Sequence, residues 1–172
     1  VFPSCTRVVS ASMATGCFPA RHGLQGNSVA LLEDGRLVLR DAGHPDFLQH
    51  KRRLTGCSLA VPTLAQRVKQ HGGAIIFSNV SPGAAYAHDP DGHGYIYHRA
   101  GSFAPGRKPV PATERLDVTL DVAGDRRMTE RFIREVLEER RPALAVLWLG
   151  EPDHMQHELA LGSPEHWCVL AH

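Results

Sequence analysis

The sequence predicts an α/β fold with a mainly parallel sheet and helices on both of its faces. Two apolar runs, 74–78 and 143–149, have the length and continuity of strands that are buried on both faces. A helical pattern precedes each run: 63–70 carries its apolar residues on one side, and 125–141 repeats them at i and i+4. Helices that alternate with buried strands are typical of parallel sheets.

The connecting segments are predicted from their turn residues and polarity. Apolar runs on either side of Asp34-Gly35 indicate a β-hairpin over 28–40. We expect the polar stretch 41–57 to be a surface loop with one short helical turn at most. Residues 81–111 are rich in Gly, Pro and His, and we expect an irregular excursion there with a single edge strand at 95–98.

Two expectations concern the segment that precedes the helix predicted over 125–141. A short strand is predicted at 116–120, and Asp125 is the expected N-cap of the helix that follows. Pro142 marks the end of that helix, because proline cannot continue it.

Composition narrows the classes of function. Nineteen basic and eighteen acidic side chains in 172 residues give a formal net charge of +1, so no nucleic-acid-binding surface is evident. No apolar run approaches the ~20 residues of a membrane span, so no membrane segment is expected. The four cysteines lie far apart, which favours buried thiols over a disulfide framework. A single disulfide bridge between two of them is the alternative.

The first chemical feature is a hydroxyl at the start of a helix. Residues 8–14 are all compatible with a helix, and Gly16 ends the run as a C′ glycine does. Thr6 is therefore expected at or beside the N-cap, among unpaired backbone N–H groups at the positive end of the helix dipole. This position suits an anion or a nucleophile that attacks one, although a cap is the commoner role of such a hydroxyl.

The second feature follows the apolar run 143–149, where ligands of α/β sheets gather beyond the strand ends. Asp153 and His157 are four residues apart, so a helical turn places them on one face. A carboxylate oxygen and an imidazole nitrogen suit a divalent transition metal, zinc above all. His154 projects about a quarter-turn away and is the weaker candidate. Taken alone, most pairs of this spacing are ordinary surface residues.

Both segments resemble the nucleotide pyrophosphatase/phosphodiesterase branch of the alkaline phosphatase superfamily. The nucleophile segment of that branch typically reads Phe-Pro-Thr-x-Thr, then Asn, then Ser-x-x-Thr-Gly-x-x-Pro-x-x-His-Gly. The residues of this chain that match the pattern, without a gap, are Phe2, Pro3, Thr6, Ser12, Thr15, Gly16, Pro19, His22 and Gly23. The same branch also carries a Glu-Pro-Asp-x-x-x-His segment, which Glu151, Pro152, Asp153 and His157 match. The helix start that follows it in the family is matched by Ser163, Pro164 and Glu165.

The resemblance implies a metal-dependent hydrolase of phosphate esters, above all a phosphodiesterase or nucleotide pyrophosphatase that acts through a phospho-threonine intermediate at Thr6. It implies two divalent metal ions, expected to be Zn²⁺, with Asp153 and His157 on one and Thr6 on the other. The substrate would be a small-molecule phosphate ester or a nucleotide. Further metal ligands would lie before Val1 and after His172. Residues 1–172 would then be part of a single alkaline phosphatase-like catalytic domain, truncated at both ends and inactive alone.

Val9 departs from the family pattern. The family usually has an Asn there, whose amide holds a phosphoryl oxygen, whereas a valine side chain cannot donate a hydrogen bond. Either another group binds that oxygen or the site is weakened. The alternatives are a non-catalytic domain of the same fold used for binding, a phosphomonoesterase or phosphonate hydrolase of the same superfamily, and a generic doubly wound domain. The catalytic hypothesis requires Thr6 and the Asp153–His157 pair to face a shared pocket.

Overall fold

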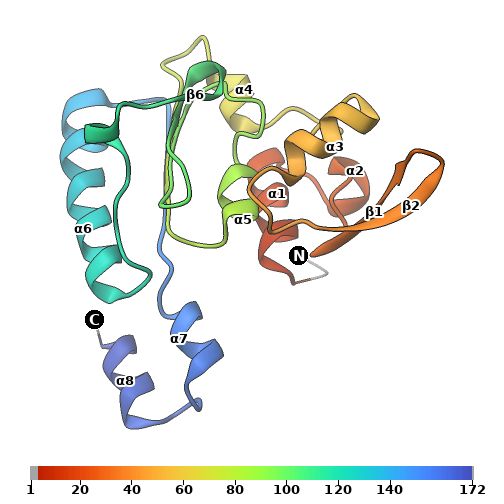
Figure 1. The fold of residues 1–172 in the computed structure, drawn as a ribbon. Helices are drawn as coiled ribbons and strands as arrows, with labels where there is room; N and C mark the ends of the chain where they lie inside the picture. The colour runs from red at the N-terminus through yellow and green to blue at the C-terminus, as the bar shows by residue number, and fades with distance from the viewer. Residues whose placement is uncertain (1–3, 172) are drawn as a thin grey trace.

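The computed structural model describes residues 4–171 and is built around a mixed sheet (Figure 1). Among these residues, the sheet has five strands in the order β6-β5-β4-β3-β7. Their bounds are Ala74–Ser78 (β3), Tyr95–Tyr97 (β4), Phe103–Ala104 (β5), Lys108–Pro109 (β6) and Leu144–Trp148 (β7). β3 pairs in parallel with both β4 and β7, whereas the two short strands β5 and β6 pair antiparallel. The predicted α/β class is confirmed.

Helices cover both faces of the sheet, because alternate side chains of β3 point to opposite sides. On one side β3 packs against α6 (Val122–Phe132) and the π-helical segment Ile133–Arg140, in a core of Ile75, Phe77, Tyr97, Val110, Leu116, Met128, Phe132 and Val136. On the other side it packs against α4 (Leu64–Val68) and α5 (Pro82–Tyr86), in a core of Ala65, Ala74, Ile76, Tyr86 and Ile96.

The first third of the chain forms a layer of its own against α5 (Figure 1). Its elements are α1 (Thr6–Thr15), α2 (Pro19–His22), β1 (Ser28–Glu33), β2 (Arg36–Asp41) and α3 (Phe47–Thr55). A separate core joins them and is formed by Ala11, Leu24, Leu31, Ala42, Phe47, Leu48, Leu59 and Ala87. This layer carries Thr6.

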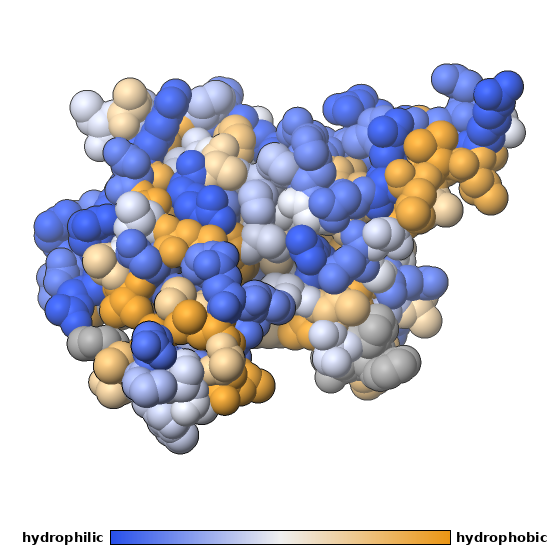
Figure 2. All heavy atoms as spheres, turned by 60° about the horizontal axis from the view of Figure 1, so that its bottom comes forward, coloured by the Kyte–Doolittle hydropathy of each residue, from blue (hydrophilic) through white to orange (hydrophobic). Residues whose placement is uncertain are grey.

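The predicted hairpin is confirmed, and it projects from the molecule (Figure 1). Leu31 points inward and is buried, whereas Leu32, Leu37 and Leu39 are exposed. Hydrophobic side chains are accordingly visible on the hairpin in Figure 2. One face of the hairpin thus packs against α3 and the other remains apolar and open.

Three expectations about the connections are wrong. The polar stretch 41–57 contains the nine-residue helix α3, because Phe47 and Leu48 are buried in the core of the first layer. The strand at 95–98 is internal, since β4 lies between β3 and β5. Residues 116–120 form no strand, and the N–H of Leu116 instead donates to the hydroxyl of Ser102.

The last third of the chain also differs from expectation at two places. The run 143–149 forms β7, which is half-exposed and lies at the end of the described sheet, not in its middle. The N-cap of α6 is Asp121, whose Oδ1 accepts a hydrogen bond from Gly124 N–H at 2.7 Å, and Asp125 lies inside the helix.

The remaining elements are short. Two 3₁₀ turns span Pro105–Arg107 and Ala112–Glu114, and the chain continues after β7 into α7 (Asp153–Glu158) and α8 (Pro164–Leu170). Within residues 4–171, the helices are all too short or too polar to cross a membrane.

Candidate active site

Thr6 is the first residue of α1, and Cys5 is the N-cap. The first backbone hydrogen bond of the helix runs from Val9 N–H to Cys5 C=O at 2.9 Å. The N–H groups of Thr6, Arg7 and Val8 therefore have no acceptor within the helix. The half-buried Thr6 hydroxyl lies at the positive end of a ten-residue helix, as predicted.

Two matched residues after Thr6 hold α1 in place. His22 is fully buried, and its Nδ1 accepts a hydrogen bond from Leu24 N–H at 3.2 Å. The ring proton is therefore on Nε2, which donates to the hydroxyl of Ser12 at 2.9 Å. Burial lowers the pKa of His22, so the ring is neutral near pH 7. The Ser12–His22 bond joins α1 to α2.

The matched glycines end the two helices. Gly16 and Gly23 have φ values of +67° and +80°, which glycine adopts without the steric cost of a Cβ. Directly before Gly16, the Thr15 hydroxyl donates to the carbonyl of Ala11 at 2.7 Å. These residues fix the direction of α1. Thr6 lies at the opposite, N-terminal end of this helix, which we call its open end because the first N–H groups there have no acceptor within the helix.

A buried carboxylate joins the ends of β3 and β7. Because these strands are parallel, the residues that follow them, Asn79 and Glu151, lie at the same edge of the sheet. Asp125 of α6, which is 5% exposed, accepts a hydrogen bond from Asn79 Nδ2 at 3.0 Å and from Glu151 N–H at 2.8 Å. The Asp125 carboxylate thereby fixes the position of the Glu151 backbone, two residues before Asp153.

The role of Asp125 was missed from the sequence, although a signal was present. Asp125 lies three and seven residues before Met128 and Phe132, on the apolar side of the helix. A carboxylate within an apolar stripe must find hydrogen-bond donors, because burying it without partners is costly. The stripe therefore pointed to a buried polar contact instead of a cap.

The structure brings Asp153 and His157 together on α7. Asp153 Oδ2 lies 3.7 Å from His157 Nε2, and the two side chains are 70% and 78% exposed. The pair faces solvent next to α8, which α7 contacts. His154 is half-buried on the same helix.

The donor atoms of the pair fit zinc, but they fill only two positions of a four-coordinate site. Within residues 4–171, no group of three or more His, Cys, Asp or Glu side chains is placed to hold a metal ion. The described part of the chain therefore offers a partial set of ligands.

Thr6 and the Asp153–His157 pair lie on separate elements. α1 contacts α2, α4 and α5, whereas α7 contacts α8. A cavity of about 450 Å³ is lined by α6, the loop 149–152 and α8, and neither Thr6 nor the Asp153–His157 pair is among its lining residues. The shared pocket that the catalytic hypothesis requires stays a prediction.

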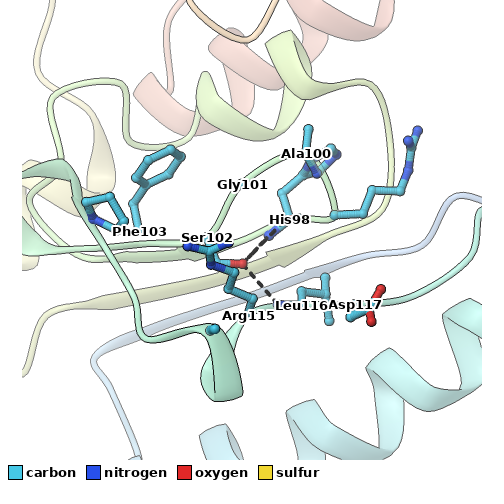
Figure 3. Close-up of a pocket in the computed structure, with 11 residues that line it drawn as sticks. His98, Ala100, Gly101, Ser102, Phe103, Arg115, Leu116 and Asp117 are labelled. Carbon is cyan, nitrogen blue, oxygen red and sulfur yellow. Dashed lines mark hydrogen bonds between the residues drawn. The ribbon is translucent and has the colours of Figure 1, made fainter.

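A second cavity, of about 500 Å³, lies at the carboxyl end of β4 (Figure 3). The Ser102 hydroxyl accepts hydrogen bonds from His98 N–H at 3.3 Å and from Leu116 N–H at 3.1 Å. His98 is buried, its Nε2 donates to Val80 C=O at 2.8 Å, and burial lowers its pKa to about 4. These polar groups are used in holding loops together, and Thr6 does not line this cavity.

The fold is of the α/β, alkaline phosphatase-like class, with helices on both faces of a mixed sheet. The chain belongs to the type I phosphodiesterase/nucleotide pyrophosphatase family, whose model matches residues 1–171.

Among solved structures, the fold is similar to that of phosphonoacetate hydrolase from Sinorhizobium meliloti 1021, crystallised in complex with phosphonoformate, with a TM-score of 0.61 and 21% sequence identity. The superposition covers 99% of this chain and 40% of that hydrolase, so the chain spans less than half of its length. No curated protein matches the chain.

Proposed function

We propose that the protein hydrolyses phosphodiesters, including the pyrophosphate bonds of nucleotides, with Thr6 as the nucleophile. The observation that carries the proposal is the position of Thr6 at the open end of α1, within a family match that extends over residues 1–171. Three backbone N–H groups without intrahelical acceptors lie at the same helix end and suit the oxygens of a phosphoryl group.

The proposed reaction has two displacements at phosphorus. Thr6 Oγ1 forms a bond to phosphorus and loses its proton, while the bond from phosphorus to one ester or bridging oxygen breaks. The departing group leaves as an alcohol from a diester and as a phosphate from a pyrophosphate. Water then attacks the phospho-threonine, which releases a phosphate monoester and restores the hydroxyl. The free N–H groups of α1 stabilise the negative charge that develops on the phosphoryl oxygens in both steps.

Two divalent metal ions, which we propose to be Zn²⁺, complete the site. When bound, such ions neutralise phosphoryl charge and lower the pKa of a hydroxyl or a water. Asp153 and His157 would hold one of the ions, since their oxygen and nitrogen are 3.7 Å apart and open to solvent. The Asp125 carboxylate would keep this pair in position through the backbone of Glu151.

The test is hydrolysis of bis(4-nitrophenyl) phosphate by the full-length protein with added zinc. Thr6→Ala is expected to abolish turnover, and Thr6→Ser to retain part of it, because serine keeps the attacking oxygen. Mass spectrometry of acid-quenched protein should find the phosphoryl group on Thr6. Thr113→Ala, at an exposed threonine, is the matched control. Turnover that is unchanged in Thr6→Ala would remove Thr6 from the mechanism.

A non-catalytic domain used for binding is the second candidate, and Val9 is the observation that favours it. A side chain without a donor at this position removes one phosphoryl contact that the family pattern provides. A binding domain would bind phosphate esters without turnover in the same assay. Conversion of the substrate that depends on Thr6 excludes this candidate.

A further inference from the structure

Arg7 lies directly after Thr6 and has an unused hydrogen-bond donor. Its Nε is buried and has no partner among the residues that the structure describes. The ion pairs found among residues 4–171 do not include Arg7 either. Buried donors are almost always paired in folded proteins, so an unpaired guanidinium nitrogen calls for an explanation.

The backbone beneath this guanidinium is fixed. Gly43 is buried, and a Cβ on it would lie 3.0 Å from Cζ and Nε of Arg7. Gly43 N–H donates to Asp41 Oδ1 at 2.7 Å, and its carbonyl accepts from Gly83 N–H at 3.0 Å. The Arg7 side chain thus packs on the backbone of Gly43, which hydrogen bonds to Asp41 and Gly83 hold in place. Such a side chain needs little ordering when a ligand binds.

A second unpartnered group lies on the same helix. Ser10 is fully buried, and its Oγ has no hydrogen-bond partner among the described residues. It follows Thr6 by four residues, so it shares a helix face with Thr6, and side chains on a helix lean toward the N-terminus. The first two turns of α1 therefore carry two orphaned polar groups, in addition to the three N–H groups that have no acceptor within the helix. Val9, where an amide donor is expected, supplies none.

We propose that Arg7 binds a phosphoryl oxygen of the substrate, in place of the amide that is absent at Val9, and that it favours phosphoryl groups with two negative charges. The inference rests on the proposed function, because it takes Thr6 as the nucleophile. A guanidinium forms charge-assisted, bidentate hydrogen bonds with phosphoryl oxygens. A phosphate monoester or a phosphonate carries up to two negative charges and a diester carries one, so the attraction to Arg7 is about twice as large for the first class.

The kinetic test compares 4-nitrophenyl phosphate with bis(4-nitrophenyl) phosphate on the zinc-loaded, full-length protein. Arg7→Met keeps an unbranched stem over Gly43 and removes the charge. We expect it to lower kcat/KM roughly 10- to 100-fold for the monoester, and less for the diester. Val9→Asn in the Arg7→Met background should restore part of the loss. Arg36→Met, at an exposed arginine of the hairpin, is the matched control and should change neither value.

A binding measurement separates this inference from the proposed function. Inorganic phosphate is titrated calorimetrically into zinc-loaded Thr6→Ala protein, with and without Arg7→Met. Weaker phosphate binding in the double variant supports Arg7 as the ligand, and equal binding overturns it. If no form hydrolyses either ester, the proposed function fails and the titration alone decides the role of Arg7. If Arg7→Met does not fold by circular dichroism, Arg7→Gln takes its place with the same criteria.

Discussion

The carboxylate of Asp125 accepts a hydrogen bond from the backbone N–H of Glu151 at 2.8 Å, across 26 residues of sequence. Its other oxygen accepts from the side chain of Asn79 at 3.0 Å. One buried charge thus connects a helix to the ends of two neighbouring parallel strands, and Asp153 follows two residues later. The position of the proposed metal ligands depends on a residue that does not bind the metal.

Replacing this carboxylate should cost stability. Asp125→Ala leaves the amide of Asn79 and the N–H of Glu151 buried without that acceptor, so we expect the free energy of unfolding to fall by about 2–4 kcal/mol. Urea denaturation followed by circular dichroism measures it. Asp117→Ala, at an exposed aspartate, should stay within about 0.5 kcal/mol of the parent. A similarly small change in Asp125→Ala would contradict the assigned role.

The bond between Ser12 and His22 can be tested separately. Ser12→Ala leaves the Nε2 proton of a fully buried imidazole without its acceptor, which should destabilise the protein by about 1–3 kcal/mol. Thermal unfolding would detect the loss as a lower Tm. Ser28→Ala, at an exposed serine, is the control. An unchanged Tm in Ser12→Ala would mean that α1 is held against α2 by packing alone.

Zinc binding should depend on the pair on α7. In the full-length protein, Asp153→Asn and His157→Asn should each weaken zinc binding roughly tenfold or more, because each removes a donor atom. His71→Asn, at an exposed histidine outside α7, is the control. Isothermal titration measures all three variants. Residues 1–172 alone should bind zinc weakly, and tight, stoichiometric binding by them would show that ligands outside this chain are not needed.

Stability should decrease when the pH falls from 7 to 5. Burial lowers the pKa of His88 and of His98 from the usual 6.5 to about 4, so in this range the unfolded chain binds protons that the folded protein does not. The free energy of unfolding should fall by about 2 kcal/mol for each ring. The lowered pKa of Glu33, about 2, acts only below pH 4.5 and does not contribute.

Urea denaturation at both pH values gives the measurement. His88→Gln should remove about 2 kcal/mol of this pH dependence, because it removes one of the buried groups that contribute to it, His22, His88 and His98. His71→Gln, at an exposed histidine, should leave it unchanged. An equal free energy of unfolding at pH 7 and pH 5 would argue against neutral, buried imidazoles at these positions.

The sequence was sufficient for elements whose signal is local. The hairpin, with its Asp34-Gly35 turn, and strand β3 could be predicted because turn chemistry and a continuous apolar run depend on adjacent residues. The pairing of Asp153 with His157 follows in the same way from their spacing along a helix.

Features that depend on distant residues were not predictable in this way. Helix α3 forms in a polar segment because Phe47 and Leu48 have partners elsewhere in the chain. Asp125 looked like a cap because the residues that it contacts, Asn79 and Glu151, lie far from it in sequence. The unpaired Nε of Arg7 is likewise visible only in three dimensions.

The contact between Gly43 and Gly83 restricts how this protein can vary. A Cβ on Gly83 would overlap the carbonyl oxygen of Ala42, and one on Gly43 would overlap the Arg7 guanidinium. Neither glycine has a functional group, yet any larger residue at either position would displace the support of Arg7. In a survey of all single substitutions, Gly83 should tolerate less change than Gly43, because a Cβ on Gly83 would meet backbone atoms, whereas the Arg7 side chain can move away from one on Gly43.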